Sequence, residues 1–476
     1  MPRDTDTPET PFPFHSVSNG EWCPPAPNAK QRAAAKLYVA ESEKRARRLG
    51  MTRREFMQTA AGTATAFMVL NTIHGLPSHA SEAVLPVTPE QCDDPEAARE
   101  LFSSRPFVVD VQLHHVDTSV FTQPFWGQLR FYSPDDPLGL SNAEKAALLS
   151  QANFVKEVFI DSETAVGVLS GVPEGVPLPV ETMKQTRDLV NQIAGSQRAI
   201  SQAMIEPNHP DPAAPTALAS IDHQVVVNGA KAIKCYTGAN SWWLDDESIA
   251  YPMYEEAVRL GLGLVNVHKG FPGLLGSMAE QYVTTRDLDK ATRDWPQLDF
   301  AVYHSGYFPD ERGISGFLAD IEEMGPRPNL YTEIGSTFAN SLFSPSPNAT
   351  AHLIGSLMKA LGSWRILWGT DSIWWGSPNW QINVFKNLQI PESLQEQFGY
   401  PALTDRDKAR ILGRNAARLY GLDIDEKRCQ IAEDPLSEFR ESGEAEAASL
   451  RSYGPTTPDA FRQLLAHAGE AAAELA

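Results

Sequence analysis

Eight short apolar runs, separated by amphipathic stretches, constrain the fold of this chain more than any other feature of its sequence. The runs are rich in β-branched residues and have the length of buried strands. Between them, apolar residues recur at helical spacing, and this alternation predicts βαβ units around a parallel sheet. The predicted strands span residues 107–112, 165–169, 199–205, 230–235, 262–268, 299–304, 330–334 and 365–369.

We predict an α/β fold, a (β/α)8 TIM barrel of the metal-dependent hydrolase type, over residues 105–422. Polar residues end the first, fifth, sixth and eighth strands, and in a closed barrel these ends face one mouth. A doubly wound open sheet is the alternative, and it would spread the same residues along an edge. The chain around the barrel divides into an N-terminal region over residues 1–83 and a polar C-terminal tail over residues 423–476 with a helix near residues 459–475.

The first predicted strand ends in an alternating polar pattern. Asp110, Gln112 and His114 are two residues apart, so they point to one face of the strand. His115 is one residue out of phase and is expected to point to the opposite face. The pattern indicates a metal site, or else a strand end with two surface histidines. An aromatic-rich insertion over residues 116–140 follows and is expected to form a lid over the mouth or a plug on its rim.

Three further strands end in residues that suit the same chemistry, namely His268, His304 and Asp371. Neutral imidazole and carboxylate groups are ligands for zinc and related divalent ions. A bound ion lowers the pKa of its water toward about 7, and a nearby carboxylate can act as general base. Together with the first strand, these ends predict one shared metal site.

Several stretches in this order carry a family resemblance: residues 110–114, 263–268, 298–304, 328–333, 366–371 and a closing helix over residues 410–420. The chain resembles the amidohydrolase superfamily, and within it the amidohydrolase-related branch (amidohydrolase 2), which includes aromatic-acid decarboxylases and lactone hydrolases. The resemblance implies a hydrolase that activates water with one divalent metal ion, with zinc expected.

The resemblance also implies a role for each matching residue. His114, His268 and Asp371 would bind the metal, and Asp371 would take the proton from its water. His304 would orient that water or polarise the substrate. Gln112 stands where the family has its first histidine, so the ligand there is an amide, which is poorer for zinc. Weaker binding, a harder ion, a water in place of this ligand and a metal-free site all stay open.

Lys234 ends the fourth predicted strand. It is expected either to pair with a substrate carboxylate or to form a rim ion pair with Glu206 or Glu333. Aromatic residues after the strand ends are predicted to line a pocket for a flat or cyclic organic acid or ester. With Lys234, the predicted substrate-binding residues are Tyr236, Trp374 and Trp375.

The N-terminal region contains an arginine pair, Arg53 and Arg54, before bulky apolar residues at positions 56 and 57. This arrangement resembles the twin-arginine export signal. The apolar run over residues 60–73 is shorter than the about 20 residues of a membrane-spanning helix, and small residues at 78–80 offer a cleavage site. We therefore expect the twin-arginine machinery as a partner and a periplasmic or exported location; an N-terminal helix with a chance arginine pair is the alternative.

Composition restricts the partners. The formal net charge of −20 argues against nucleic acid, and the four cysteines show neither metal-site spacing nor a disulfide framework. We predict a metal-dependent hydrolase of an ester, lactone or amide of a small, cyclic or aromatic organic acid. A metal-dependent decarboxylase of an unsaturated or aromatic acid and a non-catalytic binding protein are the alternatives. The sequence leaves a homo-oligomer open.

Overall fold

The computed structural model describes residues 10–22, 24–77, 81–119, 141–272 and 278–442, and all strand pairs within them are parallel. The strands form two sheets, in the order β1-β2-β3 and β4-β5-β6-β7-β8-β9. Their bounds are β1 (Val108–Leu113), β2 (Thr164–Leu169), β3 (Ala199–Ser201), β4 (Ala203–Met204), β5 (Ile233–Tyr236), β6 (Leu264–Gly270), β7 (Asp299–Tyr307), β8 (Leu330–Glu333) and β9 (Ile366–Leu367).

Each of the eight predicted strands overlaps an observed one, but the expected single sheet is divided in two. The third predicted strand is observed as β3 and β4, on either side of Gln202. Gln202 N donates to Leu169 O of β2 at 3.0 Å and Ala203 N donates to Ala232 O at 2.8 Å, so the two sheets meet at this residue. At the other junction, β1 is hydrogen-bonded to the chain that follows β9. Asp371 N donates to Gln112 O at 3.0 Å, and Leu113 forms a parallel bridge with Ser372. These bonds bring the end of β1 beside Asp371.

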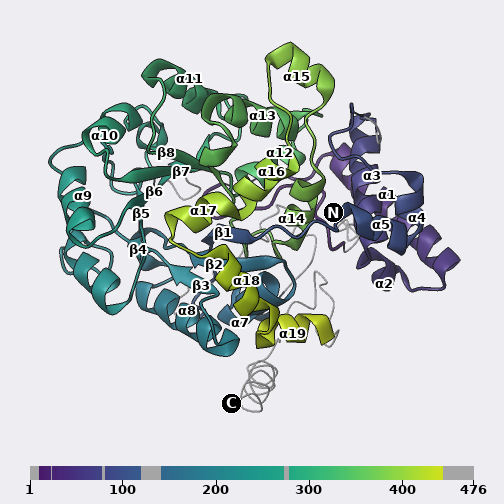
Figure 1. Ribbon diagram of the computed structural model, residues 1–476, viewed down its shortest axis with the longest axis horizontal. Coiled ribbons are helices and arrows are strands. Elements are labelled where there is room, and N and C mark those ends of the chain that lie inside the picture. Colours follow the sequence, from purple (N-terminus) through teal and green to yellow (C-terminus); the bar gives the residue numbers. More distant parts are fainter. Residues whose placement is uncertain (1–9, 23, 78–80, 120–140, 273–277, 443–476) are drawn as a thin grey trace.

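Helices follow the strands as the alternation predicts and surround the sheets (Figure 1). The helical stretch after residue 141 is interrupted, because the Ser150 side chain accepts from Asn153 N and so caps a new helix. A capping box of Thr404 and Asp407 begins α16. The helices are α6 (Asn142–Leu149), α7 (Gln151–Val155), α8 (Val180–Ala194), α9 (Ala250–Arg259), α10 (Leu288–Asp294), α11 (Ser315–Met324), α12 (Thr337–Leu342), α13 (Ala349–Leu361), α14 (Asn379–Asn387), α15 (Glu392–Phe398), α16 (Asp405–Ala409) and α17 (Asn415–Leu419).

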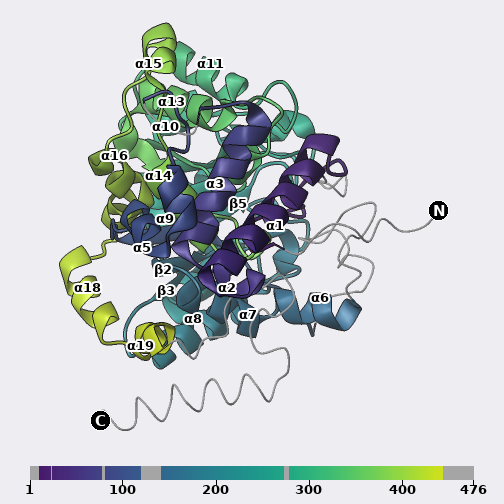
Figure 2. The same ribbon diagram turned by 90° about the vertical axis from the view of Figure 1, so that its right-hand side faces the viewer.

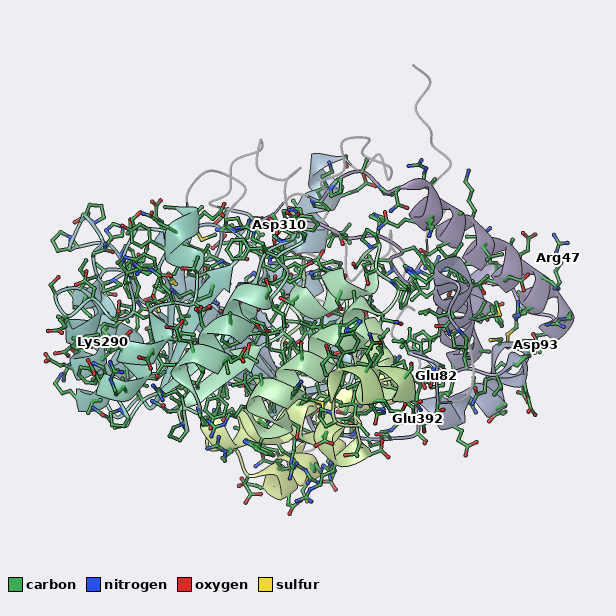
Figure 3. All side chains as sticks on the ribbon, turned by 90° about the horizontal axis from the view of Figure 1, so that it is seen from above. Arg47, Glu82, Asp93, Lys290, Asp310 and Glu392 are labelled. Atoms are coloured by element: carbon green, nitrogen blue, oxygen red, sulfur yellow. The ribbon has the colours of Figure 1, made fainter. Side chains whose placement is uncertain are left out.

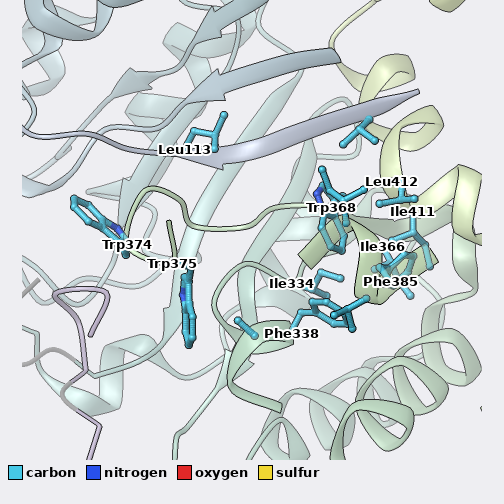
Figure 4. Close-up of a cluster of buried hydrophobic side chains, with 14 of the residues drawn as sticks. Leu113, Ile334, Phe338, Ile366, Trp368, Trp374, Trp375, Phe385, Ile411 and Leu412 are labelled. Carbon is cyan, nitrogen blue, oxygen red and sulfur yellow. The ribbon is translucent and has the colours of Figure 1, made fainter. Parts of the chain in front are cut away.

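A buried aromatic cluster joins the end of the last strand to α12 before it and α14 after it (Figure 4). The Trp368 ring lies 5.5 Å from that of Phe338 and 5.1 Å from that of Phe385. The closing helical segment comes close to β1 because Gly413 has no side chain. A Cβ there would lie 1.8 Å from Phe107 O. The start of the first strand is thereby held against the end of the barrel region.

Five N-terminal helices form a separate layer on one side of the sheets (Figures 1 and 2). They are α1 (Ala29–Leu49), α2 (Arg53–Met57), α3 (Ala60–His74), α4 (Pro89–Asp93) and α5 (Pro95–Leu101). Arg53 and Arg54 are exposed on α2, whereas most of α3 is buried. The stretch that resembles an export signal is thus folded as α2 and α3, and its export role stays a prediction. Among the described helices, none is both long enough and apolar enough to cross a membrane.

The chain after α3 is hydrogen-bonded to the start of α15. Glu392 N donates to Ser81 O at 3.2 Å, and the Ser393 hydroxyl donates to Glu82 at 2.5 Å. Arg47 and Asp93 lie at the end of the molecule opposite Lys290 (Figure 3).

The predicted tail begins with α18 (Ile424–Ala432) and α19 (Pro435–Ser442). Between them, Asp434 forms a fully buried ion pair with Arg198, so this part of the tail is packed on the sheets. The predicted helix at residues 459–475, the cleavage site at 78–80 and residues 120–140 of the predicted lid lie outside the described residues.

Candidate active site

The strand ends bring together the residues predicted to bind metal. His114 Nε2 lies 3.3 Å from Asp371 Oδ1, and Gln112 Nε2 lies 3.1 Å from His304 Nε2. The rings of His268 and His304 are 4.9 Å apart between centroids. All five residues are at most 2% exposed. The site forms because parallel strands end at one edge, as the sequence predicts.

Hydrogen bonds set the tautomers of two of these histidines. His268 Nε2 donates to Gly270 O at 2.9 Å, and His304 Nδ1 donates to Gly335 O at 2.7 Å. Burial lowers the pKa of His268 to about 3 and that of His304 to about 4, so both rings are neutral at pH 7. The lone pairs of His268 Nδ1 and His304 Nε2 therefore face the centre of the site.

Asp371 is held as a carboxylate. Burial opposes its ionisation, but hydrogen bonds from His114 and Ser336 and the nearby imidazoles outweigh this effect, so its pKa lies well below the usual value. Asn19 Nδ2 also donates to Asp371 Oδ2, at 3.1 Å. Asp371, His304 and Ser336 have positive φ angles of 58°, 63° and 53°. Backbone strain of this kind concentrates at functional sites.

An unexpected carboxylate enters from the N-terminal region. Glu21 Oε1 lies 3.2 Å from His268 Nδ1, and Glu21 Oε2 lies 3.3 Å from His304 Nε2. Burial raises the pKa of Glu21 to about 7. Sequence reasoning missed both Glu21 and Asn19, because they lie in a polar, proline-rich stretch with no periodicity that would place them.

Two carboxyl groups beside the histidines have structural contacts. Asp110 accepts hydrogen bonds from the Thr370 amide at 3.1 Å and hydroxyl at 2.5 Å, so it ties β1 to the chain after β9. Glu333 accepts from the His304 amide at 3.1 Å, and burial raises its pKa to about 8. Gly369 allows this packing, because a Cβ there would lie 1.8 Å from Glu333 Oε1.

Lys234 is buried beneath the site between two aromatic rings. Its Nζ lies 3.6 Å from the centre of the Tyr303 ring and 4.9 Å from that of the Tyr236 ring. Within the described part of the chain it has no hydrogen-bond partner, and the predicted rim ion pair with Glu206 or Glu333 is not found. Burial lowers its pKa to about 8.

The predicted aromatic residues pack directly on the polar groups of the site. Tyr236 stacks on His268 at 4.7 Å, and Trp374 stacks on His114 at 5.7 Å. Trp375 Nε1 donates to the hydroxyl of Ser336, which itself bonds Asp371. These contacts orient the site residues.

His115 points away from the site, as expected from its phase. Its Nε2 is 2.8 Å from Thr186 Oγ1, and its ring lies 5.3 Å from that of Phe154. It is not a surface residue, because it is fully buried.

The donor set fits a divalent cation. Donor atoms of Glu21, His268 and His304 all lie within 4.8 Å of one another. Among the described residues, His268 Nδ1, His114 Nδ1 and Gln112 Oε1 are buried without a hydrogen-bond partner. Imidazole lone pairs and a carboxylate that face one point are a set that zinc and related ions accept.

The parallel strands of this chain carry imidazole and carboxylate groups at their carboxyl ends. In α/β barrel enzymes the active site lies at this end of the strands. The family model described as "Amidohydrolase" matches residues 180–422, just over half of the chain. The chain therefore belongs to the amidohydrolase family and is an enzyme of the hydrolase type. Comparison with curated proteins gives no match.

Several solved structures are similar over about two thirds of the chain. A 2,6-dihydroxybenzoate decarboxylase complexed with 2,6-dihydroxybenzoate is 14% identical, with 66% of this chain and 98% of that chain covered and a TM-score of 0.42. A 4-oxalomesaconate hydratase from Rhodopseudomonas palustris is 15% identical, with 68% and 98% covered and a TM-score of 0.39. An amidohydrolase from Burkholderia multivorans with bound zinc is 11% identical, with 67% and 100% covered and a TM-score of 0.40. Likenesses of this size leave the substrate open.

Proposed function

We propose that this protein is a metal-dependent hydrolase of an ester, lactone or amide of a small, cyclic or aromatic organic acid, built on the (β/α)8 barrel of its family. One observation carries the proposal: neutral imidazole lone pairs and the Asp371 carboxylate meet at a buried point where the strands end. His268 and His304 would hold the ion, and His114, Gln112 and Asp371 are the further candidate ligands. A bound divalent ion lowers the pKa of water and polarises a carbonyl group.

The side chains of the site would transfer the proton and orient the reacting groups. Asp371 Oδ1 accepts a proton from the attacking water while the water oxygen bonds to the substrate carbonyl carbon. The bond from that carbon to the leaving oxygen or nitrogen then breaks, and the leaving group takes the proton from Asp371. Ser336 and Asn19 keep Asp371 in place through its other oxygen. His304, which is fixed by Gly335 O, orients the reacting groups.

An acid as substrate is supported by Lys234. It is an ammonium group between aromatic rings, buried below the metal-binding residues, and without a hydrogen-bond partner in the regions that the structure covers. The carboxyl groups of Glu21, Glu333 and Asp371 favour its charged form, but none of them accepts a hydrogen bond from it. The carboxylate of a substrate would supply that bond.

Metal analysis with matched variants tests the proposal. We expect about one divalent ion per chain and loss of turnover on a panel of lactones and aryl esters after chelation, with recovery on adding zinc. Asp371→Asn should lower kcat by at least about 100-fold, as expected for loss of a general base. Asp310→Asn, an exposed surface change, should have no effect.

Unchanged turnover in metal-free protein would refute the metal-dependent hydrolase. Release of CO2 from an unsaturated acid without uptake of water would identify a decarboxylase instead. Full retention of every measured function in Asp371→Asn would favour a binding protein.

We also propose that the chain is exported by the twin-arginine machinery. The exposed pair Arg53 and Arg54 before the apolar helix α3 supports this. Replacement of both arginines by lysine should retain the protein in the cytoplasm, as measured by cell fractionation. Equal export of the variant would refute the proposal.

A further inference from the structure

The segment that carries Glu21 is firmly anchored on the molecule. Phe12 and Phe14 are 3% and 2% exposed. The Phe12 ring lies 5.2 Å from that of Trp380 and 6.3 Å from that of Phe343, and Phe14 lies 5.3 Å from Tyr38. The segment is therefore packed both on the barrel region and on the N-terminal helices.

Asn19 positions Glu21 within this segment. Its Oδ1 accepts from the amides of Glu21 and Trp22, both at 3.1 Å. Its Nδ2 donates to Glu21 Oε2 at 3.0 Å and to Asp371 Oδ2 at 3.1 Å. Asn19 thus holds two carboxylates close together, Glu21 from the N-terminal segment and Asp371 from the chain after β9.

The contacts between Glu21 and the histidines need a proton or a metal ion between the acceptor atoms. His268 and His304 direct their N–H groups to backbone carbonyls, so the nitrogen atoms that face Glu21 carry lone pairs. Carboxylate oxygens also carry only lone pairs when ionised. Acceptors 3.2 Å and 3.3 Å apart repel each other unless a proton or a metal ion lies between them. A proton on Glu21 can serve only one of the two nitrogens, whereas one metal ion can serve both.

We propose that Glu21 is a ligand of the divalent metal ion, supplied by the N-terminal segment and shared with His268 and His304. The proposal rests on the metal centre of the proposed function. Two imidazoles and a carboxylate make a ligand set that leaves a position for water or substrate.

Gln112 gives a reason for this extra ligand. Its amide stands where the resemblance places a histidine, and its Nε2 lies 3.1 Å from His304 Nε2. That nitrogen has one lone pair, so the amide N–H must give up this contact when the ion binds. An amide is a poorer zinc ligand than an imidazole, whereas the Glu21 carboxylate is a good one. The N-terminal segment thereby supplies what the first strand lacks.

The proposal has a consequence for processing of the chain. Glu21 precedes the arginine pair, so cleavage at residues 78–80 would separate it from the strands. The form of the protein that binds metal most tightly is therefore the one that retains residues 10–22.

Zinc binding to the full-length, chelator-treated protein tests the role of Glu21. Isothermal titration should give a Kd for Glu21→Gln at least about tenfold weaker than that of the unchanged protein, since loss even of groups that support a ligand costs 10–100-fold. Glu43→Gln, the same change on the exposed face of α1, should leave the Kd unchanged. His268→Ala should lose binding. Cobalt-substituted protein should show an altered visible spectrum in Glu21→Gln and not in Glu43→Gln.

The possible results separate the alternatives. An unchanged Kd and cobalt spectrum in both Glu21→Gln and Glu21→Ala would overturn the inference and leave the proposed function intact. Equal or tighter zinc binding with faster turnover would overturn it too, and would identify the segment as an inhibitor that occupies the site. Absence of binding in the unchanged protein would overturn the inference together with the metal centre.

Discussion

Replacement of Lys234 by methionine tests how the site recognises its substrate. The ammonium group is fully buried, lies 3.6 Å from the centre of the Tyr303 ring and has no hydrogen-bond partner among the residues described. Methionine has a similar length and no charge. Because the change breaks no ion pair, we expect the variant to fold and to melt at or above the temperature of the unchanged protein.

The expected loss follows from one charge-assisted hydrogen bond. Such a bond contributes about 1.5–3 kcal/mol, which corresponds to roughly 10- to 150-fold in kcat/KM. The loss should appear for substrates that carry a free carboxylate and should be absent for their neutral methyl esters. Lys359→Met, on the exposed face of α13, is the matched control.

The pH profile provides a second measurement. Burial lowers the pKa of Lys234 to about 8, so the group is cationic below pH 8 and loses its proton above it. The kcat/KM of the unchanged protein for a carboxylate substrate should therefore fall as the pH rises through about 8. The kcat/KM of the methionine variant should not fall in this pH range. Equal kcat/KM values for acid and methyl ester in both proteins would refute recognition by Lys234.

Further predictions concern stability. Asp434→Asn should lower the free energy of unfolding by about 3–5 kcal/mol in urea titrations, because it leaves the guanidinium of Arg198 buried without its counter-charge; a loss below about 1 kcal/mol would contradict a tightly packed tail. Gly413→Ala should cost at least about 1–3 kcal/mol, because its Cβ would meet the fixed carbonyl of Phe107 at 1.8 Å; an unchanged melting temperature would contradict this. Burial lowers the pKa of His115 from 6.5 to about 4. The neutral ring therefore contributes about 3 kcal/mol to the free energy of unfolding above pH 6.5, and this contribution is lost as the pH falls to 4. His115→Gln should make the free energy of unfolding depend less on pH in this range, and an unaltered dependence would argue against a buried neutral ring.

The sequence was sufficient to predict where the strands lie and the edge at which the candidate site residues meet, because both depend on local patterns. Apolar runs of strand length are visible without coordinates, and parallel strands that alternate with helices end at one edge. Placing His268, His304 and Asp371 at the ends of such runs therefore placed them near His114. The out-of-phase position of His115 was predicted from the period of two along a strand.

Other features depended on how distant segments pack. The division of the third strand into β3 and β4 depends on which neighbouring strand each amide reaches, and the interruption at Ser150 on a side chain that caps a new helix. Among the described residues Lys234 has no hydrogen-bond partner, because Glu206 and Glu333, the acidic groups expected near it, are bonded to Thr216 and His304 instead.

Glu21 is the clearest case of a residue that only the tertiary structure placed. It lies far before the first strand, in a stretch with no repeating pattern of apolar residues that would indicate its path. Its position is decided by the burial of Phe12 and Phe14 and by the hydrogen bonds of Asn19. Local periodicity determines which residues share a strand face, whereas long-range packing determines which remote side chain reaches the same point.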